Sequence, residues 1–304
     1  MIPAGVFAAT LVGYADDGAL DLDRTGAHYA RLRERGIDGL FVGGTTGESF
    51  LLDRDERAAI IEHADATLGD FPWIAHVGSM DTTATIELTR LADQTGAAAI
   101  AVITPVYFAL SAREHAEHFR AVGRETSKPL IAYHIPARSG VQLGPDFFAD
   151  LAAEGVLAGL KYSSTDLYPM VEVIRRAPEG FAVYNGSDEV LTGGLALGAI
   201  GGIGSTYTVL PETYAAIYAA AAAGDLTAAR AHQVQANTLV EQLQRHNFLA
   251  FLRALIERDG VDLGPSRAPL LALDEDEAAE VREWAQRHAD LLAAGPRSPA
   301  TTTT

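Results

Sequence analysis

The sequence predicts an α/β fold, namely a (β/α)8 TIM barrel with a C-terminal helical extension. Eight short apolar or β-branched runs alternate with longer amphipathic runs along the chain. Most of the short runs are apolar throughout, which is typical of parallel strands that are covered by helices. The length of 304 residues also fits one barrel of about 250 residues plus additional helices.

The expected strands cover residues 5–12, 39–44, 73–78, 98–105, 129–135, 157–163, 181–186 and 199–205. Between them, segments such as DRDERAAIIEHADATL have apolar residues at helical spacing and Asp or Thr near the start. We therefore expect a barrel at residues 1–223, a three-helix extension at 224–293 and a disordered tail at 294–304. A doubly wound sheet is the alternative, but the strand count and the lack of an early phosphate-binding fingerprint disfavour it.

The composition narrows the class of partner and the compartment. A net charge of −17 argues against nucleic acid or an anionic membrane surface as a partner. We expect no membrane span and no signal peptide, because neither a long uncharged apolar run nor a basic N-terminal region is present. The absence of cysteine excludes disulfides and Cys-ligated zinc, and it fits a cytoplasmic protein.

Lysine is rare in this chain, which has 23 Lys plus Arg but only Lys128 and Lys161 as lysines. Lys128 is expected in a solvated loop, whereas Lys161, in GLKYSS, ends the sixth expected strand, where barrel active sites lie. An amine in an apolar site loses hydration, so its pKa falls and it can attack a ketone to form a Schiff base. Arginine cannot do this. The sequence therefore predicts imine chemistry at Lys161; the alternative is a lysine that extends into solvent.

Two further strand ends carry polar groups that suit this chemistry. GGTTGES follows the second expected strand, and its glycines together with Thr45 and Thr46 could hold a carboxylate. A tight strand-to-helix turn is the alternative explanation for these glycines. Tyr133 lies one strand from Lys161 at an inward position if the alternation holds, so its phenol could carry protons. An aromatic side chain that fills the core is the alternative.

Other kinds of site are less well supported. Metal-dependent chemistry would need clustered ligands, but the candidates His76, His134, His115 and His118 are dispersed, the last two on an expected outer helix. The glycine-rich run at 193–205 could cradle a phosphate, yet close backbone packing explains it more simply. We expect no metal and no nucleotide cofactor. A barrel that binds a keto acid without turnover remains an alternative, although Lys161, Tyr133 and Thr46 together favour an enzyme.

Four motifs, in order and in register, resemble those of the pyruvate-dependent class I lyases typified by N-acetylneuraminate lyase and dihydrodipicolinate synthase. They are GGTTGES, ITPVYF, AYHIPARSG and GLKYSS, and the resemblance runs from about residue 5 to residue 290. One departure is His134, which replaces the usual asparagine of the tyrosine segment.

The resemblance implies a role for each of these motifs. Lys161 would form the imine with pyruvate, and Tyr133 would relay protons. Thr45 and Thr46 would bind the pyruvate carboxylate, with Thr46 also joining the relay. Tyr107 would reach the site of a neighbouring subunit, because the family usually forms a tetramer of two dimers.

The second substrate is less well defined by the sequence. STDLYPMVEVIRR, VYNGSDEV, GGIGSTYTV and SRAPLLAL resemble the N-acetylneuraminate lyase branch. In that branch the positions that match Ser163, Gly186, Asp188, Glu189 and Ser205 contact the polyhydroxylated chain of the substrate. Carboxylates are strong acceptors for such hydroxyls, although capping of a helix start is the alternative for Asp188 and Glu189.

Arg138 is instead a feature of the dihydrodipicolinate synthase branch. In those enzymes, an arginine at this place binds the carboxylate of the second substrate. A guanidinium suits two-point pairing with a carboxylate, and a salt bridge at the rim is the alternative. The sequence therefore predicts an N-acetylneuraminate lyase-like aldolase. The alternatives are 4-hydroxy-tetrahydrodipicolinate synthase, which condenses pyruvate with aspartate semialdehyde, and another 2-keto-3-deoxy sugar acid aldolase.

Overall fold

Eight parallel strands form a closed barrel in the computed structural model, which describes residues 2–245 and 247–293. The predicted fold class is confirmed, and the doubly wound alternative is wrong because the eight-stranded sheet is closed. The predicted tail at 294–304 lies outside the described residues. In barrel order the strands are β1 (Gly5–Ala9), β10 (Gly201–Gly204), β9 (Ala182–Asn185), β8 (Gly159–Tyr162), β7 (Leu130–His134), β6 (Ala99–Ile103), β5 (Trp73–His76) and β4 (Gly39–Val42).

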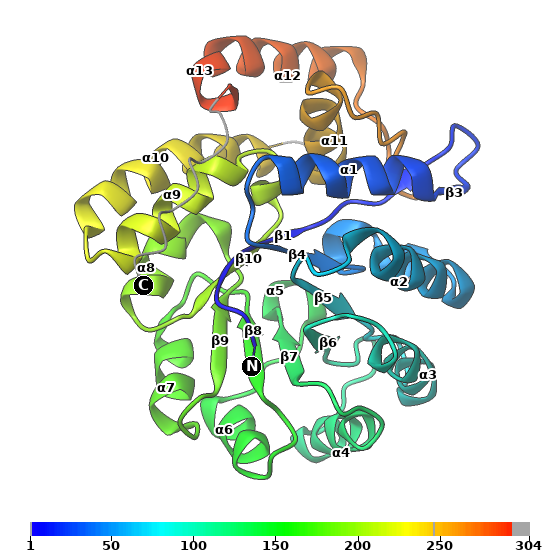
Figure 1. Ribbon diagram of the computed structural model, residues 1–304, viewed down its shortest axis with the longest axis vertical. Coiled ribbons are helices and arrows are strands. Elements are labelled where there is room, and N and C mark those ends of the chain that lie inside the picture. The colour runs from blue at the N-terminus through cyan, green and yellow to red at the C-terminus, as the bar shows by residue number, and fades with distance from the viewer. Residues whose placement is uncertain (1, 246, 294–304) are drawn as a thin grey trace.

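Helices surround the barrel as a ring (Figure 1). Those that follow the strands are α1 (Leu22–Glu34), α2 (Arg54–Leu68), α3 (Thr82–Asp93), α4 (Ala112–Gly123), the short α5 (Pro136–Ser139), α6 (Pro145–Ala153), α7 (Tyr168–Arg176), α8 (Leu191–Ala196) and α9 (Pro211–Ala222). Short 3-10 turns lie at the strand ends: η1 (Thr45–Gly47), η2 (Ser49–Leu51), η3 (Asp188–Val190) and η4 (Thr206–Thr208).

The strand register brings the predicted reactive side chains together. Tyr133 on β7 is paired with Lys161 on β8, and Lys161 is paired with Tyr184 on β9. Paired residues of parallel strands face the same side of the sheet, so all three point into the barrel. Phe7, Phe41 and other apolar side chains fill the interior beside them. A second, larger core lies between the barrel and its helices.

Strand β10 is nearly free of side chains because its neighbours leave no space for them. A Cβ atom on Gly201 would lie 1.9 Å from the carbonyl oxygen of Gly5, and one on Gly202 would lie 2.4 Å from the Tyr207 hydroxyl. A Cβ atom on Gly204 would lie 2.1 Å from Asp188 Oδ1. These glycines therefore permit close packing, as the sequence suggested.

The first strand is shorter than predicted. Residues 10–12 are apolar or β-branched and buried, but the chain leaves the barrel after Ala9. It then forms a small hairpin, β2 (Gly13–Tyr14) with β3 (Leu20–Asp21), and the Tyr14 N–H donates to the carbonyl of Leu263. The Thr10 N–H still donates to the Phe41 carbonyl of β4, and residues 11 and 12 are buried beyond the end of the strand, which explains why the whole stretch resembles a strand.

The region after the barrel consists of α10 (Leu226–Leu243), α11 (Phe248–Arg258), α12 (Glu275–Arg287) and the one-turn α13 (Ala289–Leu292). Helices α12 and α13 lie at the edge of the molecule, outside the ring (Figure 1). The acidic run DEDEAAE starts α12, where Asp274 and Glu277 form a capping box. No helix in the described part of the chain is long and apolar enough to cross a membrane.

Candidate active site

A cavity of about 310 Å³ opens at the C-terminal ends of the barrel strands. Except for Tyr107, every site residue predicted from the sequence lines this cavity. These residues are Thr45, Thr46, Tyr133, Arg138, Lys161, Ser163, Gly186, Asp188, Glu189 and Ser205.

Lys161 lies at the floor of this cavity and is only 4% exposed. Its Nζ atom lies 4.2 Å from the centroid of the Tyr133 ring and 4.3 Å from that of Phe41. Contact of an ammonium group with two ring faces is favourable. Lys161 has no ion-pair partner among residues 2–245 and 247–293, so its amine faces the cavity without a carboxylate in contact.

The tyrosine and the two threonines are arranged differently from the expected relay. The Tyr133 hydroxyl lies 3.3 Å from Thr45 Oγ1, whereas Thr46 Oγ1 lies 2.7 Å from Ser205 Oγ. The side chain within hydrogen-bond reach of the phenol is therefore Thr45 rather than Thr46. Thr46 instead connects the GGTTGES segment, residues 43–49 and here called the carboxylate loop, to Ser205 at the start of η4. The adjacent side chains of Thr45 and Thr46 on η1 therefore point in different directions.

His76 contacts both the carboxylate loop and Tyr133. Its Nδ1–H donates to the carbonyl of Gly43 at 2.9 Å, and its ring meets Tyr133 edge-on at 5.8 Å between centroids. Burial, with a smaller contribution from the Arg57 charge, lowers the pKa of His76 to about 3. The imidazole is therefore neutral at neutral pH, and with the proton on Nδ1 it can hold Gly43 in its left-handed conformation at φ 74°.

Asp188 supports the neighbouring turn instead of capping a helix. Its Oδ2 atom accepts hydrogen bonds from the backbone N–H of Thr206 at 2.8 Å and from the Thr206 hydroxyl at 2.7 Å. Burial and the adjacent Glu189 charge raise the pKa of Asp188 to about 6, against the opposing effect of the Thr206 hydrogen bonds. No side-chain cap is found at η3 or α8. The capping explanation for Asp188 and Glu189 is therefore wrong.

Ser163 and Gly186 form one wall of the cavity together. Ser163 Oγ is buried and has no hydrogen-bond partner in the described chain. A Cβ atom on Gly186 would lie 2.1 Å from this oxygen. A side chain at position 186 would therefore displace the Ser163 hydroxyl, which with glycine remains available to a ligand.

Arg138 lies on α5 at the rim of the cavity, and no ion pair of its guanidinium is found among the described residues. Its guanidinium carbon lies 5.9 Å from the centroid of the Phe248 ring. The salt bridge considered as its alternative role is therefore not formed in the described chain. Together with Phe248, Arg138 also lines an adjoining cavity of about 290 Å³.

The sequence did not indicate the wall formed by the last helices. Val240, Leu243, Gln244 and Phe248, from the end of α10 and the start of α11, line the cavity. The backbone of η3 is held by α10, because the side-chain amides of Gln233 and Asn237 donate to the carbonyls of Asp188 and Glu189. The sequence of α10 contains no local pattern that would predict these contacts, because they form only when the helix packs against η3 in the folded chain.

Tyr107 lies away from this cavity. It is 85% exposed, has a left-handed backbone at φ 80°, and its ring meets Phe108 edge-on at 5.2 Å. The predicted role across a subunit boundary is neither supported nor opposed by a single chain, and it stays a prediction.

The histidines considered as metal ligands do not form a metal-binding cluster within the described residues. His115 and His118 are on α4, where His118 Nδ1 lies 2.9 Å from Thr82 Oγ1. His134 points out of the barrel and packs against Phe148 and Tyr162, so its replacement of asparagine leaves the cavity wall unchanged. Within the described residues no group of three or more His, Asp or Glu side chains could hold a metal ion.

Known proteins share this arrangement over nearly the whole chain. An N-acetylneuraminate lyase of Citrobacter koseri is 35% identical over 286 residues, covering 93% of this chain and 96% of that protein. A catalytic lysine mutant of the Ruminococcus gnavus sialic acid aldolase superposes with a TM-score of 0.90 at 29% identity, covering 95% of this chain and 96% of its own. Dihydrodipicolinate synthase of Aquifex aeolicus gives 0.90 at 28% identity, with coverage of 96% and 100%. The sequence profile of the dihydrodipicolinate synthetase family matches residues 2–288, so this chain belongs to that family.

Proposed function

We propose that the protein is a Schiff-base-forming class I aldolase that makes or breaks a C–C bond between pyruvate and an aldehyde. The observation that carries this proposal is the position of Lys161, whose amine lies at the cavity floor against Tyr133. Membership of a lyase family and the 35% identity to an N-acetylneuraminate lyase support the same activity. We propose no metal or nucleotide cofactor and a cytoplasmic location.

In this mechanism the Lys161 amine attacks the ketone carbon of pyruvate and water leaves to give a protonated imine. The imine withdraws electrons, so the bond two carbons away can break, or form in the reverse direction. Tyr133 moves the proton to and from the carbinolamine and the aldehyde oxygen, with Thr45 at 3.3 Å as its hydrogen-bond partner. The hydroxyls of Thr45 and Thr46 bind the carboxylate.

The partner aldehyde would lie against the polar wall that contains Ser163, Asp188, Glu189 and Ser205. A free hydroxyl at Ser163 and two carboxyl groups suit a polyhydroxylated chain, which supports an N-acetylneuraminate lyase-like substrate. Arg138 supports the second candidate, condensation of pyruvate with aspartate semialdehyde, because its guanidinium has no ion-pair partner among the described residues. Another 2-keto-3-deoxy sugar acid would also use both features.

Trapping of the imine tests the reaction class. Borohydride with pyruvate should leave one reduced pyruvate adduct on Lys161, detected by peptide mass spectrometry, and turnover should survive a chelator. Lys161→Arg keeps the positive charge but cannot form an imine, so it should give no adduct. An unmodified Lys161 in the wild type, together with turnover that a chelator abolishes, would refute the proposal.

A substrate screen tests which of the candidate partners of pyruvate the protein uses. Pyruvate release from N-acetylneuraminate and from 2-keto-3-deoxy sugar acids is compared with condensation of pyruvate and aspartate semialdehyde. Arg138→Leu should change the preferred partner and leave the adduct of pyruvate with Lys161 intact. Loss of that adduct in the variant would contradict the assignment of Arg138 to the partner side of the cavity.

A further inference from the structure

Glu48 belongs to the carboxylate loop but does not line the cavity that contains Lys161. It lies between η1 and η2 with a left-handed backbone at φ 57°, an unusual conformation for a residue with a side chain. Its side chain is completely buried. A strained backbone and a buried carboxylate at one position need strong support from their surroundings.

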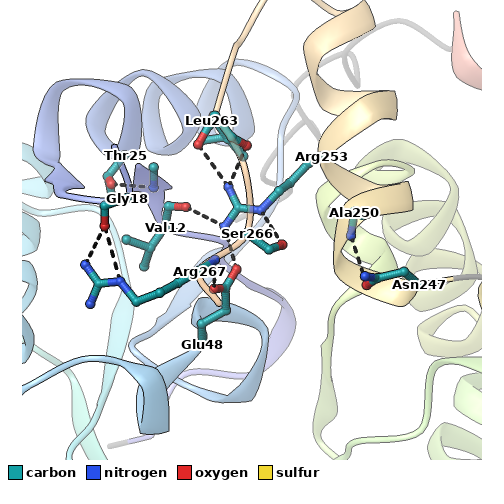
Figure 2. Close-up of polar contacts among 12 residues, drawn as sticks. Val12, Gly18, Thr25, Glu48, Asn247, Ala250, Arg253, Leu263, Ser266 and Arg267 are labelled. Carbon is teal, nitrogen blue, oxygen red and sulfur yellow. Dashed lines mark hydrogen bonds and ion pairs between the residues drawn. The ribbon is translucent and has the colours of Figure 1, made fainter. Parts of the chain in front are cut away.

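That support comes from the C-terminal extension (Figure 2). Arg253 on α11 donates from Nη2 to Glu48 Oε1 at 2.6 Å, and the backbone N–H of Arg267 donates to Oε2 at 2.9 Å. Both carboxylate oxygens are therefore occupied by donors from residues more than two hundred positions away in the chain.

Arg253 is itself fixed by a set of acceptors that hold its guanidinium in one orientation. It donates to the carbonyls of Val12 and Leu263 at 2.9 Å and, through Nε, to Ser266 Oγ at 3.1 Å. These bonds are drawn in Figure 2. The segment after β1, the carboxylate loop and the segment after α11 therefore meet at this one side chain.

The loop has little freedom to adjust if this contact changes. Gly44 accepts a hydrogen bond from the Gly47 N–H at 3.1 Å, and Thr46 is bonded to Ser205 at 2.7 Å. A Cβ atom on Gly47 would already lie 3.1 Å from the Thr10 carbonyl oxygen. The positions of Thr45 and Thr46 are thus set on the cavity side by Ser205 and on the outer side by Glu48.

We propose that the buried Glu48–Arg253 ion pair is a positioning device through which the C-terminal extension sets the geometry of the Thr45–Thr46 loop and, with it, the affinity of the site for the carboxylate of a keto acid. The proposal rests on the proposed function only for the identity of the ligand group. Neither Glu48 nor Arg253 lines the cavity that contains Lys161, so in this proposal both act through the loop.

The experiment compares two ketones that differ in the carboxylate, pyruvate and acetone, by borohydride trapping on Lys161. Glu48→Gln should raise the pyruvate concentration for half-maximal trapping about tenfold or more, because small misplacements of binding groups have effects of this size. The maximal trapping rate and the trapping of acetone should stay near their wild-type values. A general loss of the fold would affect both ketones.

The matched control is Glu212→Gln. Glu212 is also buried and also pairs with an arginine, since Arg35 donates to its two carboxylate oxygens at 2.7 Å, but it lies on α9 away from the loop. This variant should show the wild-type ratio of pyruvate to acetone trapping. If Glu48→Gln has the same ratio as Glu212→Gln, the proposal is refuted.

Two further measurements keep the test decisive. The double variant Glu48→Gln, Arg253→Gln removes both buried charges. If Glu48→Gln alone fails to fold, the double variant should still fold, and it should bind pyruvate weakly. Amide hydrogen exchange of residues 43–49, measured without any keto acid, should be faster in Glu48→Gln than in Glu212→Gln. Unchanged exchange would overturn the positioning role, whereas a wild type that pyruvate cannot modify would overturn the proposed function instead.

Discussion

The side chains in and around the cavity, taken one by one, have very different surroundings. Lys161 lies against two aromatic rings, His76 is held neutral by burial, and Asp188 is held by Thr206 beside a second carboxylate. Tyr133, which contacts Lys161, is in turn packed against His76. Chemistry at Lys161 therefore also depends on His76, through Tyr133.

The raised pKa of Asp188 leads to a prediction about stability. The folded-state pKa of about 6 lies above the ordinary value of 3.8, so the folded state binds more protons than the unfolded state between these values. The ionised carboxyl therefore costs stability that is absent below about pH 4 and fully present above about pH 6. In Asp188→Asn this cost disappears, so the difference in unfolding free energy between variant and wild type should rise by about 2 kcal/mol from pH 4 to pH 7.

Urea unfolding of both proteins at several pH values measures this difference. The amide introduced by Asp188→Asn retains an oxygen that can accept from Thr206, so the hydrogen bonds of the turn need not be lost. A difference that does not change between pH 4 and pH 7 would contradict the raised pKa of Asp188.

At the scale of elements, α10 is part of the site as well as of the extension. Gln233 Nε2 donates to the Asp188 carbonyl at 2.9 Å, and Gln233 Oε1 accepts from the Thr192 N–H at 3.0 Å. The helix thereby bonds to Asp188, the first residue of η3, and to Thr192, which follows η3. Burial of one glutamine fixes the direction in which the polar wall faces.

Gln233→Leu should weaken this wall without affecting the imine. The substitution leaves a backbone carbonyl and an N–H without partners, so the unfolding free energy should fall by about 2 kcal/mol. The KM of the sugar-acid substrate should rise several-fold, while pyruvate trapping on Lys161 stays unchanged. Gln235→Leu, on the exposed face of the same helix, is the control and should alter neither quantity. An unchanged KM in Gln233→Leu would exclude this role of α10.

The sequence predicted the elements better than their contacts. The period of two placed Tyr133 and Lys161 on the inner face, and the register of β7 with β8 confirms it. The span 5–12 was too long, because β1 ends at Ala9 although residues 10–12 are also buried. Arg253 could not be linked to Glu48, because no local pattern connects positions 205 residues apart. Phe248 was missed for the same reason, since only the packing of α11 brings it to the cavity.

At the scale of the whole molecule, we propose that the protein is a homotetramer built from two dimers, as is usual in this family. Tyr107 and Phe108 form an exposed aromatic pair outside the cavity lining, with Tyr107 in a left-handed backbone. Such a pair is suited to burial against a second copy, where the Tyr107 hydroxyl would complete a neighbouring site.

Mixing two inactive variants tests this arrangement. Lys161→Ala lacks the imine and Tyr107→Phe lacks the phenol hydroxyl, so each homomeric protein should have low activity. In mixed oligomers a site with Lys161 can receive Tyr107 from the other chain, so activity should recover after the variants are unfolded and refolded together. No recovery, in mixed oligomers verified by mass spectrometry, would place Tyr107 outside the neighbouring site.

The glycines of β10 limit how this enzyme could change its substrate during evolution. Because Gly201, Gly202 and Gly204 lie against the backbone or side chains of neighbouring segments, a larger residue at any of these three positions would collide with them. Variation that reshapes the mouth is left to Val240, Leu243 and Phe248 of the last helices, which line the cavity. Directed evolution of new aldehyde acceptors should therefore yield its beneficial mutations at the end of α10 and the start of α11, and few in β10.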